Sequence, residues 1–169
     1  TRPLPGPSLD VPEVAATLAS PRTDQAEDVR HAHNLAFADH WGTAPQAPAP
    51  WHDHWTARAN RMDLSTLALG GDGTVLAYVL AGQWVERELY VNLVGTVPEA
   101  RGRGLAAACL ARTLALAAAS GDFDRADLDV DSESPTGATS LYERLGFTVK
   151  KTFAAMQRDA PPASPARPA

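Results

Sequence analysis

The stretch Arg101-Gly102-Arg103-Gly104-Leu105-Ala106 follows a run of strand-forming residues and opens a long alanine-rich segment. Glycines at the start of a helix let backbone amides close around an anion, and the helix dipole favours negative charge at that end. The two arginines add charge-assisted hydrogen bonds to phosphate oxygens. The pattern therefore predicts a phosphate-binding loop at the start of a helix over Arg103–Ala119, which Gly121 ends.

The composition indicates one compact domain. The chain has 169 residues, of which 44% are hydrophobic, and this is enough for a sizeable core. Its net charge of -5 argues against nucleic-acid binding, which depends on basic side chains that displace counterions. We find no apolar run long enough to span a membrane and no signal-peptide pattern, so we expect a cytoplasmic protein without a membrane partner. Cys109 is the only cysteine, which excludes an internal disulfide and a thiolate-rich metal site.

Both ends of the chain are rich in proline. We expect residues 1–12 to form a linker or disordered N-terminus and residues 159–169 a disordered Pro/Ala tail, with one domain over residues 13–158. Thr1 stands where a start methionine is expected. This leaves open processing, or an N-terminal domain lost from the sequence.

Between the ends, strand and helix patterns alternate. Val14–Ser20 favours a short strand, with a helix as the alternative, and Asp24 is the expected N-cap of a helix to about Ala38 with Val29, Leu35 and Phe37 in the core. Further strands are expected over Leu64–Leu69, Val75–Gln83, Leu89–Val97, Arg125–Asp131 and Phe147–Met156, and further short helices over 51–58 and Thr136–Leu145. This order predicts an α/β (α+β) fold with a mixed sheet.

The glycines fit two kinds of phosphate site. Gly102-x-Gly104-x-x-Ala107 matches the dinucleotide fingerprint, and Asp124 lies near the spacing of a ribose-binding acid. In that fold, however, the first glycine directly ends the strand, whereas Pro98–Arg101 intervenes here. A dinucleotide-binding oxidoreductase also usually needs more chain for its substrate half, so this class stays as an alternative.

A longer string, from Gly95 through Val97-Pro98 to Arg101-x-x-Gly104-x-Ala106, resembles the acetyl-CoA site of the GNAT superfamily of N-acetyltransferases. A second match follows: Leu128–Asp131, then Ser134-Pro135-Thr136-Gly137-Ala138, then Leu141-Tyr142-Glu143-Arg144-Leu145-Gly146-Phe147 resembles the family's late motif. Ser134 stands where the family usually has Asn. The two motifs occur in the family's order, and the resemblance covers roughly Asp24 to Arg158.

The resemblance implies the GNAT fold, with a mostly antiparallel sheet of six to seven strands flanked by helices. The strands Leu89–Val97 and Arg125–Asp131 would splay apart, and the pantetheine arm of acetyl-CoA would pair with the exposed backbone between them. The pyrophosphate would lie on the amides that follow Gly102. The implied cofactor-binding residues are Val94, Gly95, Thr96, Arg101, Gly102, Arg103, Gly104, Leu105, Ala106, Ala107, Ser134 and Tyr142.

The same resemblance suggests how the reaction would be catalysed. Tyr142 resembles the family's general acid, which would protonate the departing thiolate. Asp129 aligns with a strand carboxylate that serves as the base in some relatives, and Glu88 is the other candidate, each directly or through water. Asp127, Asp129 and Asp131 could equally form a solvated strand face.

The pocket for the amine acceptor is expected in the first helices, lined by Asp39, His40, Trp41 and Trp55. As an alternative, the aromatic residues of this region could form a partly buried cap over the sheet. A metal site is not expected, because His31-x-His33 and His52-x-His54 point in different directions on a helix. Phe37–Gly42 and Glu88–Val91 look somewhat like the C-terminal half of tandem-domain members such as mycothiol synthase.

These observations predict a monomeric or homodimeric N-acetyltransferase that uses acetyl-CoA as co-substrate. Its acceptor would be a primary amine of a small molecule or peptide, and the acidic surface favours a cationic one. The alternative from a different class is a non-catalytic acyl-CoA-binding or regulatory module.

Overall fold

The computed structural model describes residues 1–4, 6, 10–39, 44–130 and 138–152. Its strands are β1 (Arg2–Pro3), β2 (Thr17–Ala19), β3 (Thr66–Leu69), β4 (Val75–Val85), β5 (Glu88–Thr96) and β6 (Arg125–Asp127). Its α-helices are α1 (Ala26–Ala36), α2 (Pro48–Trp55), α3 (Leu105–Ser120) and α4 (Ala138–Arg144), and the 3-10 turns are η1 (Thr23–Gln25) and η2 (Pro98–Ala100).

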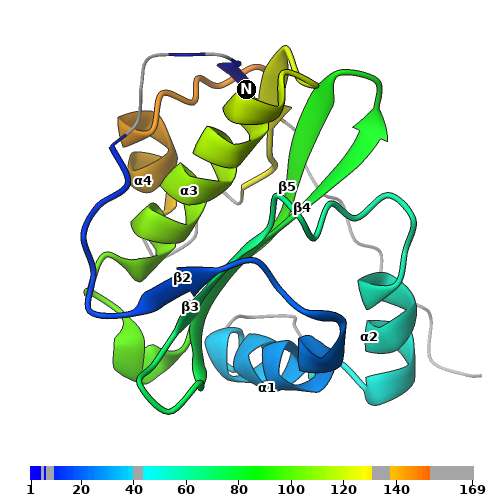
Figure 1. Cartoon of the computed structure of the whole chain (residues 1–169), viewed down its shortest axis with the longest axis vertical. Helices are drawn as coiled ribbons and strands as arrows, with labels where there is room; N and C mark the ends of the chain where they lie inside the picture. The colour runs from blue at the N-terminus through cyan, green and yellow to red at the C-terminus, as the bar shows by residue number, and fades with distance from the viewer. Residues whose placement is uncertain (5, 7–9, 40–43, 131–137, 153–169) are drawn as a thin grey trace, which may run out of the picture.

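Within these residues, the six strands form one mixed sheet in the order β1-β6-β5-β4-β3-β2, in which only β5 and β6 are parallel. Helices α1 and α2 lie on one side of the sheet and α3 on the other (Figure 1). The expected mixed, mostly antiparallel sheet flanked by helices is therefore confirmed.

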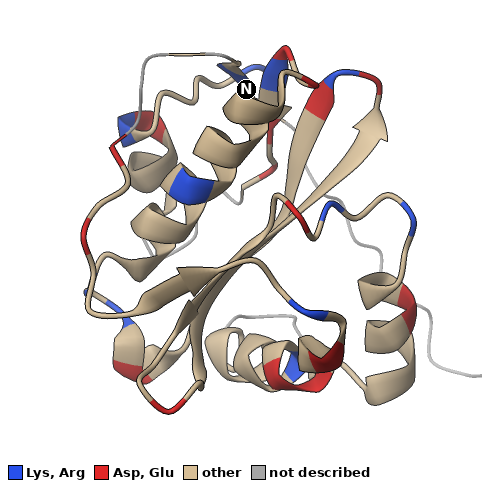
Figure 2. Cartoon of the chain, viewed as in Figure 1, with Lys and Arg blue, Asp and Glu red and all other residues tan. Residues whose placement is uncertain are grey.

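The centre of the sheet is the antiparallel meander β3-β4-β5. Strands β3 and β4 contain no charged residue and β5 contains only Glu88, at its first position (Figure 2). Both faces of such strands can be buried, and Leu67, Ala77 and Leu89 are fully shielded from solvent. The turn between β3 and β4 is closed by a hydrogen bond from the Gly70 N–H to the Thr74 carbonyl.

Two glycines in the left-handed conformation mark the two ends of α3. Gly104 and Gly121 have φ values of +74° and +71°, which side chains with a Cβ rarely adopt. The long helix predicted over Arg103–Ala119 is confirmed. It begins at Leu105 because Gly104, in the left-handed conformation, does not have the backbone dihedrals of an α-helix.

Strands β5 and β6 pair over a short distance only. Their register runs from Glu88↔Arg125 to Tyr90↔Asp127, after which β6 ends while β5 continues to Thr96. The expected strand over Arg125–Asp131 is thus shorter than predicted, because its partner diverges. This divergence confirms the expected splay.

The linker expected over residues 1–12 is wrong for the first residues. Arg2 and Pro3 form the antiparallel edge strand β1 beside β6, and the Leu4 side chain is buried. The Leu4 N–H donates to the Asp124 carbonyl over 2.7 Å. Proline is compatible with an edge strand because no ladder hydrogen bond is required of its nitrogen, so the proline spacing concealed this strand.

The final strands expected over Phe147–Met156 are also absent from the described part, which ends at residue 152. Thr148 instead exchanges backbone hydrogen bonds of 2.8 Å with Thr1. The position beside β6 that a returning C-terminal strand would need is held by β1.

The start of α1 differs from the expectation as well. Asp24 lies inside η1 and pairs with the Arg22 guanidinium, so it does not cap the helix. Val29 is buried as predicted, whereas Leu35 is 51% exposed and is not a core residue.

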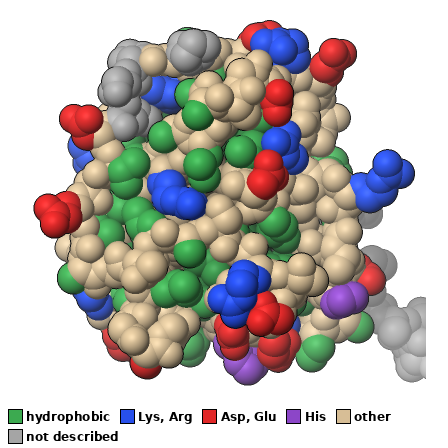
Figure 3. All heavy atoms as spheres, viewed as in Figure 1, with side chains coloured by type: hydrophobic (Ala, Val, Ile, Leu, Met, Phe, Trp, Pro, Cys, Tyr) green, Lys and Arg blue, Asp and Glu red, His purple; other side chains and the backbone are tan. Residues whose placement is uncertain are grey.

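The described residues include no helix that is long and apolar enough to cross a membrane. On the face seen in Figure 3, Lys and Arg side chains are spread singly among hydrophobic and acidic groups. This face therefore presents a mixed surface without a single dominant charge.

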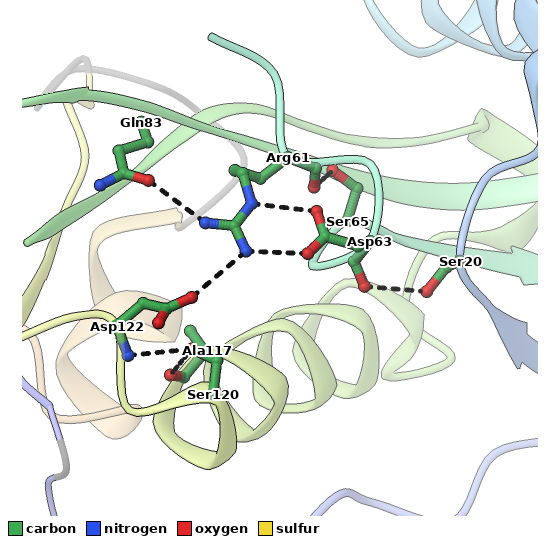
Figure 4. Close-up of polar contacts among 8 residues, drawn as sticks. All are labelled: Ser20, Arg61, Asp63, Ser65, Gln83, Ala117, Ser120 and Asp122. Carbon is green, nitrogen blue, oxygen red and sulfur yellow. Dashed lines mark hydrogen bonds and ion pairs between the residues drawn. The ribbon is translucent and has the colours of Figure 1, made fainter.

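A polar cluster joins the segment before β3 to β4 and to the end of α3 (Figure 4). The Arg61 guanidinium donates to both carboxylate oxygens of Asp63, over 3.0 and 2.8 Å, and to Gln83 Oε1 over 3.2 Å. The same guanidinium lies 3.7 Å from the Asp122 carboxylate, just beyond α3. Arg61 thus connects three segments that are distant in the sequence.

Ser65→Ala is expected to destabilise this junction by about 1–3 kcal/mol. The Ser65 hydroxyl is fully buried, accepts a 2.9 Å hydrogen bond from the Ala81 N–H and donates one of 2.9 Å to the Arg61 carbonyl. Alanine would leave the buried Ala81 N–H without this acceptor, whereas the Arg61 carbonyl keeps its hydrogen bonds from the Leu64 and Ser65 N–H groups. Urea unfolding measures the loss, with Ser20→Ala as control because its hydroxyl makes only longer hydrogen bonds, of 3.2 and 3.4 Å, and is not fully buried. Equal stability of the two variants would contradict this role of Ser65.

Candidate active site

A cleft of about 870 Å³ lies where β5 and β6 diverge. Its walls come from the end of α1, the second half of β5, the loop before α3 with the first turn of that helix, the segment after β6, and α4. The predicted site residues that line it are Asp39, Val94, Gly95, Thr96, Arg101, Gly102, Gly104, Leu105, Ala106, Ala107, Asp129 and Tyr142.

The glycine loop forms one end of the cleft. Gly102 and Gly104 both have φ of +74°, which turns the chain sharply into α3. The first amides of a helix have no acceptor within the helix, and here Leu105, Ala106 and Ala107 line the cleft. This end of the cleft can therefore bind an anion such as a phosphate.

The two arginines of the loop differ in their surroundings. Arg101 lines the cleft and donates to both carboxylate oxygens of Asp39, over 2.7 and 3.1 Å. It also donates to the Ala36 carbonyl at the end of α1, over 2.9 Å. Arg103 is exposed and does not line the cleft. The structure thus brings one of the two predicted arginines into the site.

The β5 wall carries an irregularity that sequence reasoning missed. Leu80 pairs with Leu93 and Ala81 with Val91, so Asn92 is an extra residue that forms a β-bulge. Asn92 lines the cleft and its side chain accepts a hydrogen bond from Trp84 Nε1 over 3.0 Å. A bulge leaves no clear mark in a strand pattern, which is why this residue was not predicted.

A buried polar pair supports the same wall. Gly95 packs against the Tyr78 ring so closely that a Cβ at position 95 would lie 2.5 Å from three Tyr78 atoms. The Tyr78 hydroxyl is 2.7 Å from His33 Nδ1 on α1. Burial, followed by the nearby His54, lowers the pKa of His33, so this imidazole stays neutral around pH 7. The pair was not predicted because its members are 45 residues apart in the sequence.

Tyr142 projects from α4 into the cleft. Its ring packs edge-on against Phe147, with the centroids 6.1 Å apart. Burial raises the pKa of the Tyr142 phenol above its usual value, so the group keeps its proton at neutral pH. A neutral phenol in this position can donate a proton to a leaving group.

The two candidate bases lie in different places. Asp129 lines the cleft. Glu88 forms an ion pair with Arg125 at the far end of β5 and does not line the cleft, so the structure does not bring it to the site. Asp129 also acts on Tyr90 of β5, because burial and then the Asp129 carboxylate raise the pKa of Tyr90 to about 12.

The predicted acceptor residues are only partly assembled. Asp39 lines the cleft, but Trp55 is 4% exposed and packs on Trp51 in the core, which corrects its expected role as a substrate contact. The aromatic-cap alternative describes Trp55 better. His40, Trp41 and Ser134 lie outside the described residues.

Two other groups have no visible part in this chemistry. Cys109 is buried in α3, and burial raises the pKa of its thiol to about 12. Among the residues that the structure describes, no group of three or more His, Cys, Asp or Glu side chains is placed to hold a metal ion.

Comparison with known proteins agrees with this geometry. The model of the acetyltransferase (GNAT) family matches residues 26–147. A mycothiol acetyltransferase of Salinispora tropica is 36% identical over 163 residues, which cover 87% of this chain and 48% of the relative. The chain thus spans about half the length of the relatives that it matches.

Solved structures give the same picture of the fold. A GCN5-related N-acetyltransferase from Sphaerobacter thermophilus superposes with a TM-score of 0.70 and 26% identity, covering 89% of this chain and 45% of that one. An aminoglycoside N-acetyltransferase, in complex with a CoA-based bisubstrate analogue, superposes with a TM-score of 0.62 at 16% identity, covering 85% and 98% of the two chains.

Proposed function

Because the chain belongs to the acetyltransferase (GNAT) family, we propose that it is an N-acetyltransferase that moves the acetyl group of acetyl-CoA to a primary amine. Transfer would occur by direct attack within a ternary complex. The observation that carries this proposal is the cleft between the diverging strands β5 and β6, because it joins an anion-binding helix end to a half-buried tyrosine.

The residues of the cleft fit acetyl-CoA. The pyrophosphate would accept hydrogen bonds from the amides at the start of α3, after Gly102 and Gly104. The pantetheine arm would lie along Val94–Thr96, on the edge of β5 that β6 leaves unpaired. Ser134 keeps its proposed place among the cofactor contacts. The aminoglycoside N-acetyltransferase of similar fold, which was solved with a CoA-based analogue, supports this assignment.

The reaction needs one bond made and one broken. The neutral amine attacks the thioester carbonyl carbon, and the oxyanion that develops would be stabilised by an amide of Val94–Thr96. As the carbon–sulfur bond breaks, Tyr142 donates its proton to the thiolate, which leaves as CoA. The proton lost by the amine passes to Asp129, directly or through water. We favour Asp129 over Glu88 because only Asp129 lines the cleft.

The acceptor is proposed to be a small cationic amine. Asp129 lines the cleft, and a carboxylate favours a positively charged substrate, whereas the Asp39 carboxylate is paired with Arg101. A polyamine, an amino sugar of the aminoglycoside kind and a peptide N-terminus all have this chemistry. The names of the relatives, a mycothiol acetyltransferase and an aminoglycoside N-acetyltransferase, support an amine on a small molecule.

A thiol-release assay tests the proposal. The chain is incubated with acetyl-CoA and, in turn, spermidine, glucosamine, neamine or a short peptide, and the products are identified by mass spectrometry. We expect amine-dependent release of CoA together with an acetylated amine. CoA binding without release for any of these amines would favour the non-catalytic acyl-CoA-binding module instead.

A further inference from the structure

The positive charge of Arg101 already has a partner in the cleft. Its guanidinium meets Asp39 through two parallel hydrogen bonds and the Ala36 carbonyl through a third. Ala36 is the last residue of α1, and the last carbonyls of a helix carry partial negative charge. At the end of α1, Arg101 therefore already uses the N–H donors from which a phosphate would accept hydrogen bonds.

Arg103 provides the natural comparison within the same loop. It is exposed, and no ion pair or hydrogen bond of its side chain is found among the described residues. The two arginines flank Gly102, so they stand at similar distances along the chain from the anion-binding amides. They differ in their partners, which for Arg101 are the Asp39 carboxylate and the Ala36 carbonyl.

We propose that Asp39 is a positioning residue that holds Arg101 on the end of α1 and thereby limits the affinity of the cleft for the pyrophosphate of CoA. This inference rests on the proposed function, because it assumes that CoA is the ligand. The guanidinium has one fork of donors for two anionic partners, so the phosphate and Asp39 compete for it. Weaker retention of CoA would speed release of this product.

The size of the effect follows from the exposure of the pair. The side chains of Arg101 and Asp39 are 36% and 60% exposed, and pairs of this kind are held only weakly. Holding Arg101 at Asp39 therefore lowers the affinity for CoA only modestly. We expect Asp39→Asn to tighten CoA binding by about three- to fivefold.

Titration calorimetry with CoA on the native chain, Asp39→Asn, Arg101→Ala and the double variant tests this inference. Asn keeps the size of the side chain and removes its charge. The gain from Asp39→Asn should fall by at least half when Arg101 is absent. Affinity for CoA should also depend more steeply on salt in Asp39→Asn, because one more cation then contacts phosphate. A merely structural Asp39 would change neither quantity.

Arg103→Ala is the matched control. We expect it to weaken CoA binding both in the native chain and in Asp39→Asn, because Arg103 does not pair with Asp39. Unchanged or weaker CoA binding by Asp39→Asn would overturn the inference while leaving the proposed function intact. An equal gain with and without Arg101 would also overturn it, since the charge of Asp39 alone would then be responsible. No CoA binding by the native chain would overturn both.

Discussion

Tyr142→Phe is expected to lower the rate of acetyl transfer by about 10²- to 10⁴-fold while leaving the affinity for CoA unchanged. The substitution removes only the phenolic hydroxyl, whose proton burial keeps in place by raising the pKa of this group. The ring and its edge-on contact with Phe147 are retained, so the fold should not change. Steady-state kinetics with the amine found by the thiol-release assay, together with calorimetry, measures the two quantities separately.

Tyr90→Phe is the control for this prediction. Tyr90 also carries a raised pKa, but it does not line the cleft; its hydroxyl interacts with Asp129 and not with the leaving thiolate, so its loss should lower the rate less than tenfold. A Tyr142→Phe variant that turns over at the native rate would show that the thiolate receives its proton from another group. A parallel loss of CoA affinity would instead assign Tyr142 to cofactor binding.

Gly95→Ala is expected to destabilise the protein by about 1–3 kcal/mol and to abolish CoA binding. A Cβ at this position would lie 2.5 Å from Cε1, Cζ and Oη of Tyr78, which is closer than atoms can approach. Tyr78 is fully buried and its hydroxyl is held by His33, so the ring cannot move aside. The β5 backbone must shift instead, and this backbone forms the wall of the cleft. Thermal unfolding and calorimetry with CoA measure both effects.

Gly71→Ala is the matched control, because nothing lies within 4 Å of a Cβ at position 71 and the backbone there is compatible with alanine. It should change stability by less than about 0.5 kcal/mol. In the double variant Gly95→Ala/Tyr78→Val, the loss of stability should be less than the sum of the two single losses. Full additivity would mean that the Tyr78 ring is not the obstacle.

The sequence was most informative where local chemistry alone determines structure. Gly104 and Gly121 mark the ends of α3 because a left-handed residue cannot continue a helix, and this can be predicted without knowing the fold. The meander β3-β4-β5 follows from apolar runs separated by the Gly70–Gly73 turn. The resemblance to a known family then placed these elements in one sheet.

The remaining features depend on contacts between distant segments. β1 exists because β6 offers an open edge, and no local pattern around Pro3 reveals that partner. Glu88 and Asp129 have the same carboxylate chemistry in the sequence, and only the divergence of β5 and β6 puts one of them in the cleft. Trp55 was assigned to the acceptor because aromatic residues suit both a core and a binding site.

The measurement that tests the central claim most directly is calorimetric titration of the native chain with CoA and, separately, with NADPH. The cleft between β5 and β6, with its anion-binding end at α3, predicts saturable binding of CoA with one site per chain and no heat of binding for NADPH. Binding of NADPH in place of CoA would contradict the account and restore the dinucleotide interpretation of the glycine loop.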